Sequence, residues 1–173
     1  RARDLLGRVE AVSVTPVDTK VRTSVRPDAG AEWKVLGWDA SGVVEAAGPK
    51  ATAFRPGDEV FYAGAIGRPG TNAEFHLVDE RIVGRKPASL GFAQAAALPL
   101  TAIIAWENLF DRHDAGKPVT GAAPAIRIIG GQGGAASGGT ELAREYPDLT
   151  VSDTQSRHET ARWCRALGAT QSA

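Results

Sequence analysis

Residues 125–137 read Ala-Ile-Arg-Ile-Ile-Gly-Gly-Gln-Gly-Gly-Ala-Ala-Ser. A β-branched run passes directly into a glycine cluster, and a helix-compatible segment, residues 140–145, follows. A strand-to-helix turn that holds a pyrophosphate needs this order, because small residues let the backbone N–H groups at the helix start approach the anion. Here Gly131 would allow the tight turn, Gly133 the approach to the phosphates, and Ala136 the close packing of helix on strand. On these residues alone, a purely structural glycine turn is the alternative.

The residues that follow extend this pattern. Residues 149–151 are typical of a second strand, and residues 159–167 have helical spacing with Gly168 as a C-terminal cap. The order strand, glycine turn, helix, strand, helix is the first part of a doubly wound nucleotide-binding sheet. Such a sheet needs more strands, and the chain begins at Arg1 without any methionine. We therefore expect a piece of a longer protein.

Composition bounds the remaining possibilities. The chain has 173 residues with 43% hydrophobic content, and its 20 acidic and 20 basic side chains leave no net charge. This balance argues against bulk attraction to nucleic acid or to an anionic membrane. A single cysteine, Cys164, excludes an internal disulfide and a multi-cysteine zinc cluster. No apolar run reaches transmembrane length, so we expect a soluble, cytoplasmic protein.

The first half of the chain has a different texture. Short alternating segments separated by Gly and Pro predict strands at residues 8–14, 42–46, 57–62, 74–78 and 81–83. From Gly91 the period becomes helical, and Pro99 divides an apolar helical pair, residues 92–98 and 101–109. An all-β region therefore precedes the glycine-loop region.

Several ordered motifs resemble one family, the medium-chain dehydrogenases/reductases. They are GWDASGVVE (37–45), PGDEV (56–60), NAEF (72–75), AAALP (95–99), TA (101–102) and AWE (105–107), ending at the glycine loop. The chain is most similar to the quinone oxidoreductase branch, often labelled zinc-type alcohol dehydrogenase-like proteins, from about residue 6 to residue 170.

The resemblance implies a fold class and an activity. It implies a GroES-like β-barrel catalytic domain at residues 1–98, without its N-terminal strand. A partial α/β Rossmann domain with its leading helix, containing only the first βαβα part, would follow at residues 99–173. The active site would lie between the domains, and the complete protein would be a homodimer. The implied reaction is hydride transfer from a nicotinamide to a quinone or an α,β-unsaturated carbonyl compound.

The sequence favours a zinc-free site. Catalytic zinc needs three protein ligands, usually Cys and His. The ligand positions of the zinc-dependent branch fall on Thr15, Trp38 and Asp39, which are not a replacement set. The three histidines are far apart in sequence, so structural or surface roles are expected for them.

The resemblance gives Thr15, Asp18 and Tyr62 as candidates to line the substrate site. Relatives commonly have Asn where Thr15 stands, and Tyr62 has the alternative of being a strand aromatic. An activated carbonyl accepts hydride if donors stabilise the developing oxyanion. The predicted cofactor-binding residues are Thr101, Gly131, Gly133, Gly134, Ala135, Ala136, Ser156 and Arg157. For Thr101 the alternative is a helix N-cap.

Two residue patterns bear on the choice of nicotinamide. Asp153 lies twenty residues after Gly133. In NAD-dependent enzymes an acidic residue at about this spacing binds the ribose hydroxyls, so the spacing alone favours NADH. Alignment back from residues 167–170 places Gln155 at that acid's position, with Ser156 and Arg157 in the loop that would hold a 2′-phosphate. We therefore predict NADPH, with NADH as the alternative.

The segment 135–140, Ala-Ala-Ser-Gly-Gly-Thr, departs from the family pattern. Two glycines early in a helix cost on the order of 1 kcal/mol each relative to alanine. Together with Thr15 in place of Asn, this leaves a second hypothesis open: a non-catalytic lens-type or interaction relative that keeps the fold.

Overall fold

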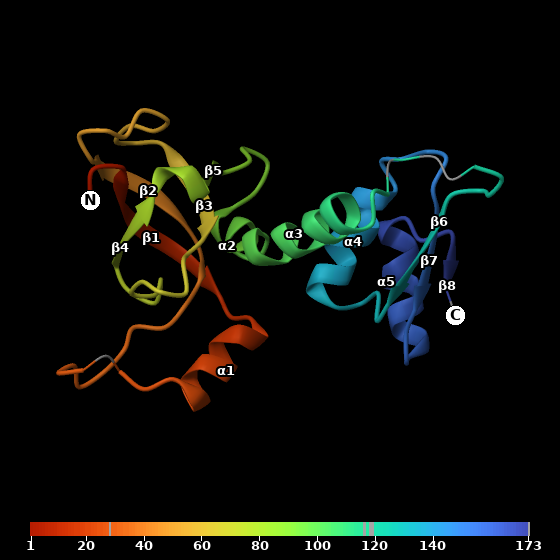
Figure 1. Ribbon diagram of the computed structural model, residues 1–173, viewed down its shortest axis with the longest axis horizontal. Coiled ribbons are helices and arrows are strands. Elements are labelled where there is room, and N and C mark those ends of the chain that lie inside the picture. Colours follow the sequence, from red (N-terminus) through yellow and green to blue (C-terminus); the bar gives the residue numbers. More distant parts are fainter. Residues whose placement is uncertain (28, 116, 118–119, 173) are drawn as a thin grey trace. The chain divides into compact units, whose positions relative to one another are not determined.

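The computed structural model describes residues 1–27, 29–115, 117 and 120–172, which form two compact units (Figure 1). The first unit comprises residues 1–100 and the second residues 101–173. This division lies two residues after the boundary predicted at 98/99.

The first unit contains a five-stranded antiparallel sheet. Its strands are β1 (Asp4–Ser13), β2 (Asp39–Ala47), β3 (Glu59–Ala63), β4 (Phe75–Asp79) and β5 (Val83–Arg85), in the order β4-β1-β2-β3-β5. The helices are α1 (Pro16–Ser24), the 3-10 turn η1 (Glu80–Ile82) and α2 (Phe92–Ala96). The predicted strands at 8–14, 42–46, 57–62 and 74–78 overlap β1 to β4 and are confirmed. The strand predicted at 81–83 is wrong in its bounds, because residues 80–82 form η1 and β5 begins at Val83, and the region is not all-β, because it includes α1. Helix α1 was not predicted; Thr15 begins it, with Pro16 as its first residue and Asp18 at the third position.

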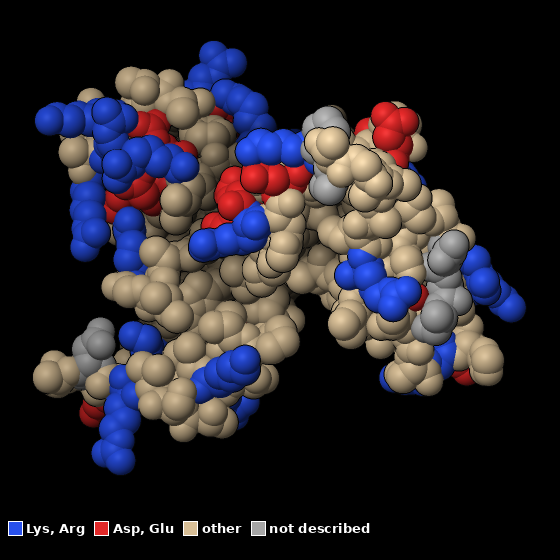
Figure 2. All heavy atoms as spheres, turned by 45° about the vertical axis from the view of Figure 1, so that its right-hand side comes forward, with Lys and Arg blue, Asp and Glu red and all other residues tan. Residues whose placement is uncertain are grey.

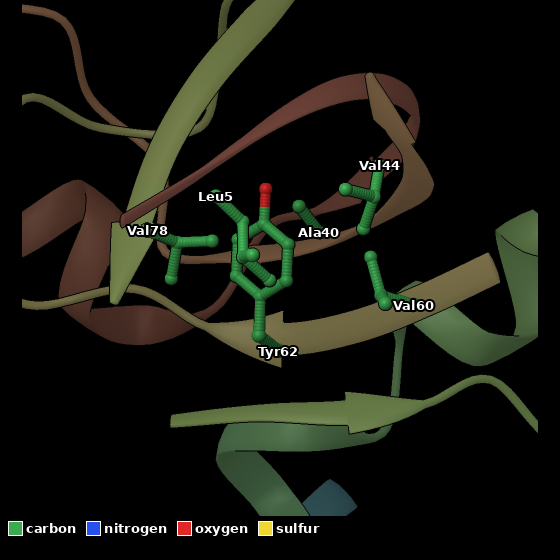
Figure 3. Packing of buried hydrophobic residues seen from close by; sticks show 6 residues of the cluster. All are labelled: Leu5, Ala40, Val44, Val60, Tyr62 and Val78. Atoms are coloured by element: carbon green, nitrogen blue, oxygen red, sulfur yellow. The ribbon is translucent and has the colours of Figure 1, made fainter. Parts of the chain in front are cut away.

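Alternating residues of four strands form the core of this unit. Their side chains point toward one another in Figure 3, which labels Leu5, Ala40, Val44, Val60, Tyr62 and Val78. Every one of these side chains is at most 3% exposed. The period of two in each strand places them on one face, and their burial supplies the main stabilisation of the sheet.

Glu80 is a buried acid that joins three segments of this unit. Its Oε2 accepts hydrogen bonds from the backbone N–H groups of Thr52 (2.7 Å) and Ala53 (2.8 Å), and its Oε1 accepts one from Arg3 (2.8 Å). The backbone bonds, followed by the Arg3 guanidinium, hold the pKa of Glu80 below its usual range.

The second unit contains three parallel strands with helices. Its elements are α3 (Pro99–Trp106, whose first two residues belong to the first unit), η2 (Glu107–Arg112), β6 (Ala125–Ile129), α4 (Gly134–Ala143), β7 (Thr150–Thr154), α5 (His158–Leu167) and β8 (Gln171–Ser172). The strand order is β6-β7-β8, and Leu109, Ala143, Leu149 and Val151 form the core. The predicted succession from the glycine-loop strand through α5 is confirmed. Gly168 caps α5 with φ +118°, a conformation that favours glycine.

Helix α4 forms despite Gly138 and Gly139. A Cβ on Gly138 would lie 3.7 Å from the Cβ of Ala105, and one on Gly139 would lie 3.7 Å from the Cδ1 of Ile128. The helix backbone therefore packs close to α3 and β6. This close packing explains why two glycines are accommodated at these positions, although glycine lowers the helix propensity of the segment.

Charged side chains of both signs share the surface. Figure 2 shows acidic groups lying among basic ones on the face that it presents. Arg68 and Asp4 form a bidentate ion pair, with N–O distances of 2.6 and 3.2 Å.

Within the described ranges, no helix is both long enough and apolar enough to span a membrane.

We expect Glu80→Gln to lower the thermal midpoint of the first unit at neutral pH, because a neutral amide replaces the anion that three donors bind. Since the pKa of Glu80 is lowered, its stabilisation is present above the unfolded value of 4.5 and is lost as pH falls through the folded value. The gap between wild type and variant should therefore shrink on acidification, as measured by thermal unfolding. Exposed Glu74→Gln is the matched control; an unchanged midpoint in Glu80→Gln would contradict the role of the anion.

Candidate functional site

The glycine loop, residues 130–133, connects β6 to α4. Gly130 has φ +70°, in the left-handed region that favours glycine. Its N–H points to the Oγ1 of Thr154 at 3.3 Å, and the N–H of Gly131 donates to the carbonyl of Thr154 at 3.0 Å. Both bonds fix the loop to the end of β7, the neighbouring parallel strand.

The start of α4 leaves backbone donors open. Gly133 is the N-cap and supplies no side-chain cap, and its own N–H donates to the carbonyl of Gly130 at 2.9 Å. The first helical N–H with an acceptor is that of Ser137, which donates to Gly133 at 2.7 Å. Among the described residues, none accepts a hydrogen bond from the N–H groups of residues 134–136. Unpaired N–H groups at a helix start are suited to binding an anion.

Small residues keep this helix start accessible. A Cβ on Gly133 would lie 3.3 Å from the carbonyl oxygen of Gly130. A Cβ on Gly134 would lie 3.1 Å from the Cγ2 of Thr101, so Thr101 contacts the start of α4. Thr101 is the third residue of α3 and not its N-cap, so the alternative interpretation of this residue is wrong. The structure therefore brings Thr101 together with the predicted loop residues.

The predicted 2′-phosphate loop follows β7 directly. Thr154 ends the strand and binds the glycine loop, and Ser156 and Arg157, both exposed, follow after Gln155. Arg157 is the N-cap residue of α5, and its carbonyl accepts from the Oγ1 of Thr160 at 2.7 Å. Among the described residues, none forms a hydrogen bond or an ion pair with the guanidinium of Arg157. The cation is thus available near the carboxyl edge of β7.

Asp153 is the penultimate residue of β7, but its side chain is turned into the interior, which weakens the sequence argument for NADH. The side chain is fully buried, and its Oδ2 lies 3.2 Å from the Oγ1 of Thr140 in α4. The alternation of β7 explains the placement, because residues 151 and 153 share the buried face of the strand. A carboxylate without exposed surface is not available to the hydroxyls of a ribose.

Sequence analysis missed a second support of the glycine loop. The indole N–H of Trp163 donates to the Oγ of Ser137 at 3.0 Å, and that hydroxyl donates to the carbonyl of Gly131 at 3.1 Å. The one signal in the sequence is Ser137, a hydroxyl in the first turn after the glycine cluster.

In the first unit, Thr15 and Asp18 lie together at the start of α1. The Oδ2 of Asp18 accepts from the N–H of Thr15 at 2.8 Å and from its hydroxyl at 3.0 Å. The Oδ1 of Asp18 is buried and has no hydrogen-bond partner among the residues that the structure describes. The pair therefore presents one open acceptor, while the hydroxyl proton of Thr15 is already used.

Asp39 lies near this pair and is completely buried. Its Oδ1 accepts from the N–H of Leu100 at 2.8 Å, and its Oδ2 accepts from the hydroxyl of Ser13 at 3.2 Å. Burial raises the pKa of Asp39, and the charge of Asp18 acts in the same direction. Ser13 was not identified from the sequence.

Tyr62 lies elsewhere, in the core of the sheet. It is 3% exposed, its ring stacks on that of His76, and its hydroxyl is 3.3 Å from the Nδ1 of His76. The other ring nitrogen of His76 is 3.0 Å from the carbonyl of Pro69. Burial raises the pKa of Tyr62 far above its ordinary value. This placement speaks against a substrate-lining role and agrees with the alternative of a strand aromatic.

The donor set near Thr15 does not fit catalytic zinc. Within the part of the chain that the structure describes, no three His, Cys, Asp or Glu side chains are placed so that they could hold a metal ion. Both oxygens of Asp39 are already bonded, Trp38 offers no ligand atom, and Thr15 is a neutral hydroxyl. Zinc sites require three such ligands and an open position.

Comparisons with known proteins agree with the fold. The family model "Alcohol dehydrogenase GroES-like domain" matches residues 1–105. The zinc-type alcohol dehydrogenase-like protein of Staphylococcus aureus (strain COL) is 45% identical over 167 residues, which is 96% of this chain and 49% of that protein. The chain thus spans about half the length of the curated relatives it matches.

Solved structures give the same result. A protein from Rhizobium etli CFN 42, named as a zinc-dependent alcohol dehydrogenase, is 63% identical, with TM-score 0.94 over 98% of this chain and 49% of that one. The Pseudomonas syringae quinone oxidoreductase is 27% identical, with TM-score 0.78 over 99% and 50%. Mycobacterial Rv1454c in complex with NADPH is 27% identical, with TM-score 0.81 over 99% and 50%.

The predicted fold class, a GroES-like domain followed by a partial Rossmann domain, is therefore confirmed. With its family-model match, its two-unit fold and these relatives, the chain belongs to the alcohol dehydrogenase GroES-like family of the medium-chain dehydrogenase/reductase superfamily.

Proposed function

We propose that this protein is a zinc-independent, NADPH-dependent oxidoreductase that acts on quinones or α,β-unsaturated carbonyl compounds. The observation that carries the proposal is the glycine loop, which leads into the open start of α4. Thr154 binds this loop to the end of β7, and from there the chain continues to Ser156 and Arg157. Two loops at the carboxyl edge of adjacent parallel strands are the usual position of a dinucleotide.

The two loops offer different recognition to the cofactor. The N–H groups of residues 134–136 are suited to the pyrophosphate, and the hydroxyl of Ser156 with the guanidinium of Arg157 is suited to a 2′-phosphate. The burial of Asp153 removes the acid that favoured NADH. The structure of mycobacterial Rv1454c with NADPH supports the same choice of cofactor.

The cofactor, when bound, supplies hydride to an electron-poor carbon of the substrate. A quinone or enone can accept hydride without a metal, because conjugation delocalises the negative charge that develops. The open Oδ1 of Asp18 would accept a hydrogen bond from a hydroxyl of the substrate or cofactor. Thr15 would stabilise an oxyanion only after its hydroxyl turns away from Asp18. The name of the Pseudomonas syringae relative supports the substrate class.

The role of Asp39 follows from its bonds and not from a metal. It joins β2 to Leu100 and Ser13, so we assign it the positioning of these segments. A cytoplasmic location, which was expected from the lack of a long apolar run, and a homodimer, which the resemblance implies, stay predictions.

We predict that Gly133→Val weakens NADPH binding by about 100-fold or more, because its methyl groups occupy the approach to the helix start and its Cβ crowds Gly130. Fluorescence titration of NADPH measures this. Gly138→Ala is the matched control, since its Cβ makes an ordinary 3.7 Å contact. Unchanged affinity in Gly133→Val would contradict a pyrophosphate site at this loop.

Arg157→Ala should weaken NADPH by about 10–100-fold, the range of a lost charged hydrogen bond, and leave NADH nearly unchanged. The salt dependence of NADPH binding should also flatten. Ser156→Ala should act in the same direction with a smaller effect. The exposed Arg162→Ala of α5 is the control, and equal losses for both cofactors in Arg157→Ala would rule out a 2′-phosphate contact.

Metal analysis of the dialysed protein should find zinc well below one per chain, because the ligand set is missing. Asp39→Asn should lower stability without altering metal content, since the amide cannot accept at both of its terminal atoms. Chelation should leave NADPH oxidation by a simple quinone unchanged. Stoichiometric zinc would refute the zinc-free site, and NADPH binding without turnover on quinones and enones would favour a non-catalytic relative.

A further inference from the structure

A buried polar cluster lies beneath the glycine loop. It consists of Asp153 on β7, Thr140 on α4 and Cys164 on α5, each with 0% of its surface exposed. The neighbouring core residues of this unit, such as Ala143 and Val151, are apolar. Polar groups in such surroundings need partners for each proton and lone pair.

The hydroxyl of Thr140 lies between two acceptors. It donates to the carbonyl of Ala136 at 3.0 Å and also lies within donor distance of the carboxyl oxygens of Asp153, at 3.2 and 3.4 Å. A hydroxyl has one proton, so Thr140 shares it between the nearer carbonyl and the carboxyl group. A shared neutral donor compensates a buried carboxylate only in part, whereas a neutral carboxyl group can donate its own proton to the Oγ1 of Thr140.

The surroundings of Asp153 also favour its neutral form. No Lys or Arg of the described chain pairs with it, and the residue opposite it on β6 is Ile128. The titratable group that faces it from α5 is the thiol of Cys164, and α4 contributes only Thr140. Burial raises the pKa of Asp153 and outweighs the hydrogen bonds from Cys164 and Thr140, which act to lower it; burial, followed by the hydrogen bond to Asp153, also raises the pKa of the Cys164 thiol.

The carboxyl group touches the glycine loop itself. A Cβ placed on Gly131 would lie 2.6 Å from the Oδ2 of Asp153 and 2.8 Å from its Cγ. The backbone of Gly131 therefore rests directly on this carboxyl group. A negative charge here would face the loop that is to receive the pyrophosphate, and a buried anion would draw in water or move.

We propose that Asp153 is a positioning residue that supports the glycine loop in its neutral form, and that loss of its proton weakens dinucleotide binding. This inference rests on the proposed function. It makes cofactor affinity depend on pH through a group that does not touch the cofactor.

The test compares the NADPH affinity of the intact wild-type protein and Asp153→Asn from about pH 4, near the unfolded value of 3.8, to about pH 9. The amide keeps the size of the neutral acid, can donate to Thr140, and cannot ionise. As Asp153 ionises, wild-type affinity should fall relative to the variant, by at most about tenfold per pH unit. The ionisation of NADPH cancels, because both proteins bind the same ligand. Exposed Asp148→Asn, the control, should follow wild type.

Unfolding without cofactor supplies the independent measurement. Because the folded pKa of Asp153 is raised, the neutral carboxyl stabilises fully below the unfolded value of 3.8, and this is lost as pH rises through the folded value. The unfolding midpoint of the wild type should therefore fall relative to Asp153→Asn as pH rises. Asp153→Ala, also unable to ionise, should show the same flat profile even if it is less stable.

Coinciding pH profiles of wild type and both neutral variants, in binding and in unfolding, would overturn the proposal. If no protein binds NADPH at any pH, the proposed function fails, and unfolding alone decides the state of Asp153. A pH-dependent gap in midpoint would then support the neutral carboxyl of Asp153, and no gap would refute it.

Discussion

The parallel pairing of β6 with β7 is the constraint on which the nucleotide-binding part depends. Parallel neighbours end at the same edge, so the glycine loop after β6 and the loop after β7 emerge side by side. Thr154 converts this proximity into a fixed geometry, because its carbonyl accepts from Gly131 while its hydroxyl faces Gly130. Without that register, the open N–H groups of α4 and the guanidinium of Arg157 would be unrelated features.

The elements of the fold that repeat a local pattern were predictable. The strand-to-helix turn, α5 with its Gly168 cap and the alternating strands of the first unit each leave a signature within a few residues. Helix α1 lacked such a signature, because its apolar positions are few. Its start is visible only as Thr15, Pro16 and Asp18, a capping pattern inside a segment that otherwise suggests a loop.

Site residues were predictable where backbone chemistry decides, and not where side chains meet across elements. The glycines of the loop follow from the need for space, whereas Tyr62 needed its neighbours to be known: the alternation of β3 turns it into the core beside His76. Asp153 shows the same limit. Counting residues suggested a ribose ligand, but the facing side of β7 and the presence of Thr140 depend on packing that spacing does not encode. The unusual residues Thr140 and Asp153 become intelligible as a contacting pair.

The burial of Cys164 gives this protein a chemical reporter of its own motion. The chain has one cysteine, and its thiol is fully enclosed between α5 and the strand that carries Asp153. A thiol reagent can reach it only when this part of the molecule opens, so the rate of modification measures the local opening free energy. Because the same opening exposes the layer under the glycine loop, any ligand that binds the closed form slows the reaction in proportion to its occupancy. A single covalent label thereby records local dynamics and ligand binding at one position in the fold.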